Sequence, residues 1–197
     1  MKEFWNERYN EAHYAYGTTP NDFLKAQQIG SDLKVLCLAE GEGRNGVYLA
    51  GLGNEVTCID YSEEGLKKTS QLAAQNGVGV TCVCADLGEV KLEGNSWDLI
   101  VGIFAHFPKK VKQHIWPQIY TALKPGGKLI MEVYDQEQLR FGTGGPQHPD
   151  LLYTIEELEE LLGNQFDAYQ IEKVFREVHE GAYHNGASAT IQVLAIK

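Results

Sequence analysis

The stretch that decides the fold is Val35-Leu36-Cys37-Leu38-Ala39-Glu40-Gly41-Glu42-Gly43-Arg44-Asn45-Gly46. Its first five residues form an apolar, strand-like run, and Gly41, Gly43 and Gly46 then match the pattern G-x-G-x-x-G. Asp60 follows Gly41 by 19 residues and ends the next apolar run. A glycine-rich turn between a strand and a helix, with an acidic residue about 20 positions later, is typical of nucleotide-binding α/β proteins. The alternative is that the glycines only make a tight turn and that Asp60 is an ordinary loop residue.

Outward from this turn, apolar runs and amphipathic stretches alternate. We expect strands at 35–39, 55–59, 78–85, 97–104 and 128–134, and helices at 45–51, 63–75, 109–123 and 154–162. The connection between the last two expected strands, 168–176 and 187–196, is too short for a crossover helix, so they pair as an antiparallel hairpin. Five strand–helix repeats and a hairpin predict an α/β fold: a doubly wound, seven-stranded, mostly parallel sheet with a C-terminal antiparallel hairpin and helices on both faces.

Several residues mark the expected boundaries. Ser62 is placed to cap the helix at 63–75, and Gly77 to end it. Thr154 and Glu157 have the spacing of a capping box. Pro117 removes a hydrogen bond from its helix, which predicts a kink or a restart there. We expect a turn at 124–127, where the sequence is Lys-Pro-Gly-Gly.

The charge balance bears on partners. The 197 residues carry 17 Lys+Arg against 27 Asp+Glu, a formal net charge of −10. Nucleic acids and anionic membranes attract basic surfaces, so we expect neither as a partner. An acidic chain is compatible with small cationic ligands.

The cysteines bear on location and on metals. Cys37, Cys58, Cys82 and Cys84 all lie inside apolar, strand-like segments, and none has the spacing C-x-x-C. We therefore expect reduced thiols in a cytoplasmic protein and no metal site. The sequence also offers no targeting segment and no apolar run of 18 residues, which agrees with a cytoplasmic location.

The glycine-rich turn carries two carboxylates, from Glu40 and Glu42. A dinucleotide would place its pyrophosphate against such a turn. Like charges in contact repel by about 1–4 kcal/mol, whereas an adenosine ligand with a sulfonium and an ammonium group would be attracted. S-adenosylmethionine is such a ligand. The alternative is that both glutamates point to solvent.

The next strand ends repeat this chemistry. Asp60 can accept hydrogen bonds from both ribose hydroxyls, and Asp86 can accept one from an adenine amino group with apolar Leu87 beside it. The alternative for Asp86 is a turn cap.

Together with Leu123-Lys124-Pro125-Gly126-Gly127, these motifs resemble those of the class I, Rossmann-like S-adenosylmethionine-dependent methyltransferases. The order of the motifs is more specific than any one of them, and Gly43-Arg44-Asn45 resembles the small tellurite-resistance and thiopurine-methyltransferase-like group. Two departures concern strand one, where Cys37 replaces the usual acidic residue and Ala39 the usual first glycine. Glu40 is the candidate to supply the missing carboxylate.

The resemblance implies a cofactor-binding set. Gly41 and Gly43 would let the backbone approach the cofactor, Asp60 would hold the ribose, and the backbone at Phe104 would line the methionine side. The full predicted set is Glu40, Gly41, Glu42, Gly43, Asn45, Asp60, Tyr61, Ala85, Asp86, Leu87 and Phe104.

The acceptor side is less defined by the sequence. Methyl transfer from a sulfonium is an in-line displacement that needs a general base only when the acceptor is protonated. His106 follows strand four, and Arg176 and His184 lie in the last hairpin, so we take these three as candidate acceptor-side residues. Arg176 would bind an oxyanion and a histidine would take a proton. The alternatives are a surface loop histidine and a solvated hairpin.

The whole chain, 1–197, is expected to form one methyltransferase domain. Its parts would be an N-terminal helical cover (1–30) containing Trp5 and Tyr9, a cofactor-binding core (31–134), a lid loop (135–152), and a C-terminal helix with the hairpin (153–197). For the cover and the lid, the alternatives are a plain packing helix and surface disorder.

The sequence thus predicts a methyltransferase that acts on a small-molecule acceptor, such as a thiol or an oxyanion, as a monomer or weak dimer. The alternatives are an NAD(P)-dependent reductase and a non-catalytic S-adenosylmethionine-binding module.

Overall fold

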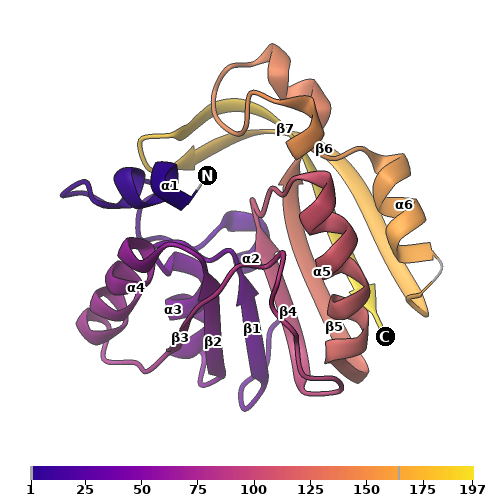
Figure 1. Ribbon diagram of the computed structural model, residues 1–197, viewed down its shortest axis with the longest axis horizontal. Helices are drawn as coiled ribbons and strands as arrows, with labels where there is room; N and C mark the ends of the chain where they lie inside the picture. Colours follow the sequence, from indigo (N-terminus) through magenta and orange to yellow (C-terminus); the bar gives the residue numbers. More distant parts are fainter. Residues whose placement is uncertain (1, 164) are drawn as a thin grey trace.

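The computed structural model describes residues 2–163 and 165–197 (Figure 1). In these residues a seven-stranded sheet has the order β3-β2-β1-β4-β5-β7-β6. Strands β1 to β5 are mutually parallel, and β7 runs antiparallel to both β5 and β6. The predicted α/β sheet with its C-terminal antiparallel hairpin is confirmed. The strands are β1 (Lys34–Leu38), β2 (Glu55–Asp60), β3 (Thr81–Cys84), β4 (Trp97–Ile103), β5 (Leu123–Tyr134), β6 (Ala168–Glu180) and β7 (His184–Ile196).

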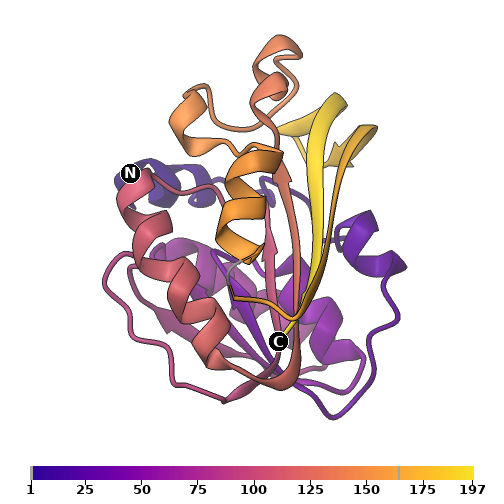
Figure 2. The same ribbon diagram turned by 90° about the vertical axis from the view of Figure 1, so that its right-hand side faces the viewer.

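Helices cover the two faces of this sheet. Figure 2 shows α5 and α6 on one side of the sheet and α2 on the other. Each face has its own apolar core, one built around Ile100 and Trp116 and the other around Leu49 and Val101. Continuous apolar strands such as β4 suit a sheet that is buried on both faces. The helices are α1 (Lys2–Tyr9), α2 (Asp22–Ala26), α3 (Arg44–Gly51), α4 (Glu63–Gln75), α5 (Lys109–Ala122) and α6 (Ile155–Gly163), with 3-10 helices η1 (Gln136–Arg140) and η2 (Pro149–Leu151).

The predicted caps are confirmed. Ser62 Oγ accepts the N–H of Gly65 at 3.2 Å, and Gly77 follows α4 with a left-handed φ of 69°. Thr154 Oγ1 accepts the N–H of Glu157 at 3.1 Å, which is the N-cap half of the predicted capping box, whereas the Glu157 carboxylate pairs with Lys112 at 3.0 Å. The predicted restart at Pro117 is wrong, because α5 runs through this residue as one helix. Pro117 lies on the exposed side of the helix, where water can satisfy the carbonyl that the proline leaves unpaired.

Three element boundaries differ from those expected. In the third repeat, the described chain between β3 and β4 contains turns and no helix. β3 begins only at Thr81, because the Val78 N–H still bonds to the Ala73 carbonyl at the end of α4. Residues 124–127 are not a separate turn: β5 already begins at Leu123 and continues through an irregularity opposite Trp97. A Cβ on Gly127 would lie 2.8 Å from the Lys124 carbonyl oxygen, so this compact irregularity needs glycine there.

The last hairpin is longer than expected. β6 and β7 pair from Ala168↔Ile196 as far as Glu180↔His184, so most of the expected connection is strand. The long hairpin arches above the carboxyl ends of the parallel strands (Figure 1) and meets the N-terminal segment there, where the Ala182 N–H bonds to the Ala15 carbonyl at 3.0 Å. This arrangement encloses the edge of the sheet where ligands of doubly wound folds bind.

No helix in the described residues is both long and apolar enough to cross a membrane.

Candidate active site

The glycine-rich turn follows β1 with three left-handed residues, Ala39 (φ 51°), Gly41 (φ 63°) and Gly43 (φ 91°). A Cβ on Gly41 would lie 2.6 Å from Tyr9 Oη, so the tyrosine of α1 covers the turn directly. A Cβ on Gly43 would lie 2.6 Å from Thr69 Cγ2 on α4. Gly43 therefore permits close packing against α4, which differs from the cofactor approach expected of it.

Glu40 caps the helix that follows the turn. Its Oε1 accepts the N–H groups of Asn45 and Gly46 at 2.8 and 2.7 Å. Burial raises the pKa of Glu40 to about 7, against the lowering effect of these hydrogen bonds and of Arg44. Its second oxygen, Oε2, makes no hydrogen bond within the described part of the chain. The Glu40 carboxylate therefore keeps one oxygen free of hydrogen bonds to the described residues.

Glu42 is differently placed from the expectation. Its Oε1 pairs with Lys68 Nζ at 2.7 Å and its Oε2 accepts the Ala15 N–H at 2.7 Å. The buried carboxylate thus fastens the N-terminal segment to α4. Asn45 is used in a similar way, because its Oδ1 accepts the Asn21 N–H at 2.9 Å. Both oxygens of Glu42 and the Oδ1 of Asn45 thus hold protein segments in place, whereas Asn45 Nδ2 makes no hydrogen bond within the described residues.

Asp60 lies at the end of β2, beside the glycine turn. Its Oδ2 accepts the Gly41 N–H at 2.9 Å and its Oδ1 accepts the Ser62 N–H at 2.8 Å. Burial raises the pKa of Asp60 to about 6. Each carboxylate oxygen has two lone pairs, so both can still accept a ligand hydroxyl. Tyr61 follows, half-buried, with the pKa of its phenol raised by burial and then by Asp60.

The end of β3 holds the expected adenine residues. The Ala85 N–H bonds to the Asp60 carbonyl at 3.0 Å, which joins this strand end to that of β2. Asp86 is exposed, and its Oδ1 accepts the Gly88 N–H at 2.7 Å, as in a turn cap. Leu87 is buried. Asp86 Oδ2 makes no hydrogen bond within the described residues and stays available to a ligand.

Phe104 ends β4 with a left-handed φ of 52°, a strained conformation for a bulky residue. Its ring lies 4.4 Å from the ring of Tyr134 and 4.7 Å from that of His184. Tyr16 of the N-terminal segment packs 4.4 Å from His184. We name these four residues, Tyr16, Phe104, Tyr134 and His184, the aromatic wall. It brings four distant segments together at the strand ends.

The three predicted acceptor-side residues differ in what they leave free. His106 Nδ1 lies 3.3 Å from the Leu151 carbonyl and its Nε2 lies 3.3 Å from the Tyr134 N–H. These contacts assign the proton to Nδ1, and burial lowers the pKa of His106 to about 3. Its ring therefore holds the 149–153 segment against β5 with both nitrogens engaged.

Arg176 is likewise engaged. Its Nε and one terminal nitrogen donate to Glu132 at 3.0 and 2.6 Å in a two-pronged pair. Glu132 is fully buried in β5 and also accepts Asn21 Nδ2 at 2.6 Å. Asn21 donates as well to Glu180 at 2.8 Å, and Glu180 pairs with Arg44. Arg176 thus belongs to a buried ionic network, in which Glu132 already occupies the guanidinium that the sequence offers as an oxyanion ligand.

His184 is the one of the three whose ring makes no hydrogen bond within the described residues. It is 8% exposed and lies at the start of β7. Burial, then Arg44, lower the pKa of His184 well below its usual range, so the ring is neutral at physiological pH.

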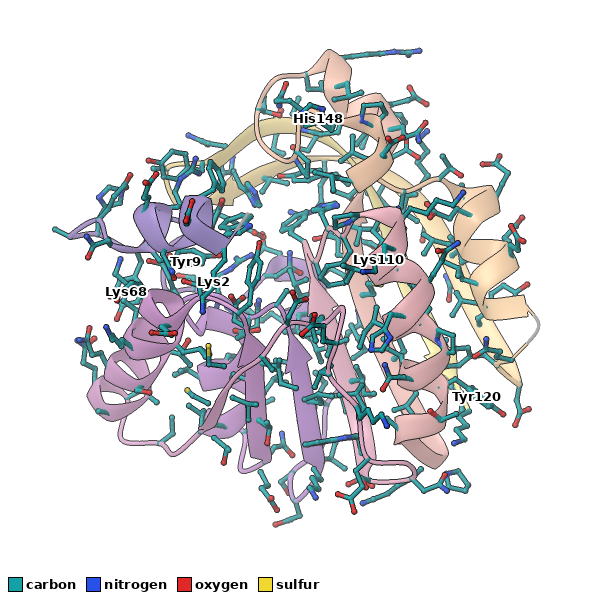
Figure 3. The ribbon with its side chains drawn as sticks, in the orientation of Figure 1. Lys2, Tyr9, Lys68, Lys110, Tyr120 and His148 are labelled. Carbon is teal, nitrogen blue, oxygen red and sulfur yellow. The ribbon has the colours of Figure 1, made fainter. Side chains whose placement is uncertain are left out.

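Several residues of this site are absent from the predicted set. Tyr9 reaches the site from a covering helix and Tyr134 from the end of a strand, and only the folded chain reveals these positions. Figure 3 shows Tyr9 between α1 and α4. Glu132 carried a signal that could have found it, because it is a lone carboxylate inside an apolar strand. Asn21 carried none.

These residues fit a cationic adenosine cofactor. The turn presents the free oxygen of Glu40 and the carboxylate of Asp60, while the nearby cations Arg44 and Lys68 are already paired with Glu180 and Glu42. Such a donor set suits an ammonium, a sulfonium and ribose hydroxyls, and it does not suit a pyrophosphate.

Comparisons with known proteins agree. Residues 35–127 match a methyltransferase domain family. The chain is 34% identical over 99 residues to the uncharacterized methyltransferase YbaJ of Bacillus subtilis, which is 50% of this chain and 39% of that protein. It is 30% identical over 95 residues to the probable S-adenosyl-L-methionine-dependent methyltransferase TehB of Haemophilus influenzae, which is 48% of this chain and 33% of that protein. The match thus spans less than half the length of either relative.

Solved structures share the fold. A structure from a study of disulfide-to-thioacetal conversion in echinomycin biosynthesis matches with a TM-score of 0.78 and 16% identity, over 100% of this chain and 93% of that one. A methyltransferase structure from Methanosarcina mazei matches with a TM-score of 0.70 and 17% identity, over 91% and 98% of the two chains. Residues 35–127 therefore match a methyltransferase domain, and the chain resembles S-adenosylmethionine-dependent methyltransferases such as TehB.

Proposed function

We propose that this protein transfers a methyl group from S-adenosylmethionine to a small-molecule acceptor by in-line displacement. The observation that carries the proposal is the closure of the acceptor side. The N-terminal segment joins the hairpin through Ala182 and Ala15, and Arg8 lies 3.6 Å over the Tyr183 ring. A site roofed by its own chain favours a small acceptor over a macromolecule, which would need an open face.

The cofactor roles follow from the free atoms. Glu40 Oε2 is placed to bind the ammonium group, and Asp60 the ribose hydroxyls, while Asp86 and Leu87 hold the adenine ring. Phe104 bounds the methionine side, where its left-handed backbone turns β4 away from the cofactor. The bound cofactor supplies an electrophilic methyl group on a positively charged sulfur. The protein holds the acceptor in line with that methyl group and excludes water, which accounts for much of the rate enhancement of such a displacement.

On the acceptor side, the aromatic wall positions the acceptor, and the neutral His184 ring is the group that can accept a hydrogen bond from it. His106 and Arg176 act by holding neighbouring segments in place.

Residues 135–152 are the lid of this site. The Asn185 N–H bonds to the Thr143 carbonyl at 3.0 Å, and Thr143 Oγ1 donates to the Ala187 carbonyl at 2.6 Å. The segment therefore rests on the hairpin, and the three glycines at 142, 144 and 145 supply left-handed or otherwise unusual backbone angles. Limited proteolysis between Phe141 and Pro149 should slow when S-adenosylhomocysteine, the product of the cofactor, and the acceptor are both present.

Calorimetry tests the proposal. S-adenosylmethionine and S-adenosylhomocysteine should bind with one site per chain, and NADH should not. Binding of NADH alone would refute the methyltransferase function. Binding of S-adenosylmethionine without turnover on any of a broad set of small nucleophiles would indicate the non-catalytic alternative.

A further inference from the structure

The aromatic wall contains polar atoms that lack partners. Tyr134 Oη and His184 Nδ1 are buried, and neither makes a hydrogen bond in the part of the chain that the structure describes, although Ser188 lies beside Tyr134. Tyr134 is 0% exposed and His184 is 8% exposed. Folded proteins seldom leave buried polar atoms unpaired, because each lost hydrogen bond to water costs free energy. Tyr134 Oη and His184 Nδ1 are therefore candidate contacts for a ligand.

The two side chains lie under the same short segment. A Cβ on Gly144 would lie 3.0 Å from His184 Cδ2 and 3.1 Å from Tyr134 Oη. A Cβ on Gly145 would lie 2.6 Å from Tyr134 Cδ2. The lid thus packs through two glycines on the Tyr134 hydroxyl and ring and on the His184 ring.

The arginines that approach the aromatic wall are paired with carboxylates. Two guanidinium groups approach it, those of Arg44 and Arg176, and each is paired with a buried carboxylate, Glu180 and Glu132 respectively. Asn21 bridges the two carboxylates and completes their hydrogen bonding. Neither guanidinium can turn to an anionic acceptor without leaving a buried carboxylate unpaired.

The other nearby groups do not change this balance. His184 is neutral, as its low pKa requires. Arg8 is the remaining cation that acts on His184, and its guanidinium lies against the Tyr183 ring and donates to Tyr16 Oη at 3.4 Å. Tyr16 therefore stands between Arg8 and the rest of the wall.

We propose that the methyl acceptor is a small, uncharged nucleophile that carries a proton, hydrogen-bonded by Tyr134 and His184, and that the site rejects anionic acceptors. With the proton of His184 on Nε2, Nδ1 accepts a hydrogen bond from the acceptor, and the Tyr134 hydroxyl pairs with a second polar atom. This inference rests on the proposed function and narrows its acceptor to one class, in place of the oxyanion that the sequence left open.

Acceptor pairs of matched size test the charge. 2-Mercaptoethanol and mercaptoacetate are both thiols and differ mainly in one carboxylate, as do benzyl mercaptan and 4-(mercaptomethyl)benzoate. Binding to the protein saturated with S-adenosylhomocysteine is measured by calorimetry, and methyl transfer by product analysis. The uncharged member of at least one pair should bind more tightly and have a higher kcat/KM, by about tenfold or more.

The outcomes separate the two proposals. Equal or stronger use of the anionic members, or of tellurite, overturns the inference and leaves methyl transfer intact. Failure of both uncharged thiols to bind also overturns it. Failure of S-adenosylhomocysteine itself to bind refutes the proposed function instead.

Tyr134→Phe tests the hydrogen bond. This change removes an unpaired hydroxyl, so the melting temperature should stay the same or rise, while KM for the uncharged thiol should rise about tenfold. Tyr120→Phe, on α5 far from the strand ends (Figure 3), is the matched control and should change neither. A fall in the melting temperature without a change in KM would show a structural tyrosine and overturn the inference.

His184→Gln and Glu132→Gln complete the test. His184→Gln should raise KM for the uncharged thiol, whereas the control His179→Gln, exposed on the same hairpin, should not. Glu132→Gln removes a carboxylate from Arg176, so the preference should move about tenfold towards mercaptoacetate. An unchanged preference in a folded Glu132→Gln protein contradicts the charge argument; where that variant does not fold, Tyr134→Phe decides.

Discussion

The cofactor half of the molecule, β1 to β4, and the acceptor half, β5 to β7 with the N-terminal segment, are built in different ways. In the cofactor half the decisive hydrogen bonds are short in sequence: Glu40 reaches residues 5 and 6 positions away, and Asp60 reaches Gly41, 19 positions away. In the acceptor half Asn21 joins Glu132 and Glu180 across 111 and 159 positions. Local motifs therefore specify the cofactor, and the tertiary fold specifies the acceptor.

The two halves also use charge differently. The carboxylates of Glu40 and Asp60 make no salt bridge within the described residues, and burial raises their pKa values to about 7 and about 6. Glu132 and Glu180 are buried beside arginines that pair with them. The first arrangement leaves carboxylates available to a cationic ligand, and the second stabilises the fold. Four changes test this difference.

The largest effect is expected in the acceptor half. Arg176→Met leaves Glu132, which is 0% exposed, without its guanidinium, and should lower the free energy of unfolding by about 3–5 kcal/mol. Urea denaturation measures the loss. Adding Glu132→Met should restore much of the stability, because two apolar side chains can replace a buried pair. A stable Arg176→Met protein that has lost only acceptor binding would instead support the oxyanion role.

The next effect belongs to the cofactor half. Asp60→Asn removes the charge that the ribose hydroxyls require, at a cost of about 1.5–3 kcal/mol per charge-assisted hydrogen bond, so the Kd for S-adenosylmethionine should rise roughly 10- to 150-fold. Calorimetry measures this change. Asp32→Asn, exposed before β1 at the opposite end of the sheet, is the control and should bind normally. Unchanged binding in Asp60→Asn would place the ribose elsewhere.

Acidic pH should weaken cofactor binding while it stabilises the free protein. Ionised Glu40 and Asp60 attract the cofactor, so affinity should fall by up to about tenfold per pH unit as pH drops through about 7 and then about 6. Because both pKa values are raised by folding, the folded state binds these protons more tightly than the unfolded state. Their contribution to stability therefore declines as pH rises from about 4 to about 7.

Glu40→Gln separates these effects. It should remove the part of the pH dependence near pH 7 from both the binding and the unfolding curves. If the binding curve of Glu40→Gln still changes near pH 7, another group controls cofactor affinity.

The smallest effect concerns backbone strain. Ala39 has a φ of 51°, where a side chain costs about 1–2 kcal/mol, so Ala39→Gly should relieve strain and lose part of the gain to unfolded-chain entropy. We expect a net gain of about 0.5 kcal/mol, or about 1–2 °C in the melting temperature. Phe104 has a similar φ of 52°, but Phe104→Gly should destabilise the protein, because it also removes the ring at the centre of the aromatic wall.

The sequence predicted much of the fold from local signals. Ser62, Gly77 and Thr154 mark helix ends through hydrogen bonds to residues within a turn or so, and those ends are confirmed. The missing helix between β3 and β4 was not predicted, because the repeat pattern on either side of that segment implied one. The restart at Pro117 was wrong, because the energetic cost of a proline depends on what surrounds the helix, which the sequence does not state.

The roles within the site were harder to predict than its place. Glu42 was expected to face the cofactor, yet Lys68 and Ala15 take both of its oxygens. Arg176 was expected to meet the acceptor, yet Glu132 holds it. In both cases the partner lies in another element. The hydrogen-bonding positions that the side chain leaves free are therefore known only from the folded structure.

By itself, the sequence determined the doubly wound sheet and the place of the cofactor site, because apolar periodicity and the glycine turn act over a few residues. Only the tertiary structure decided which carboxylates are free, that Arg44 and Arg176 are compensated, and that Tyr16, Phe104, Tyr134 and His184 form one wall. The physical reason is that burial and pairing are properties of neighbours in space. Whether a charged residue binds a ligand or stabilises the fold depends on the partners that distant segments place beside it.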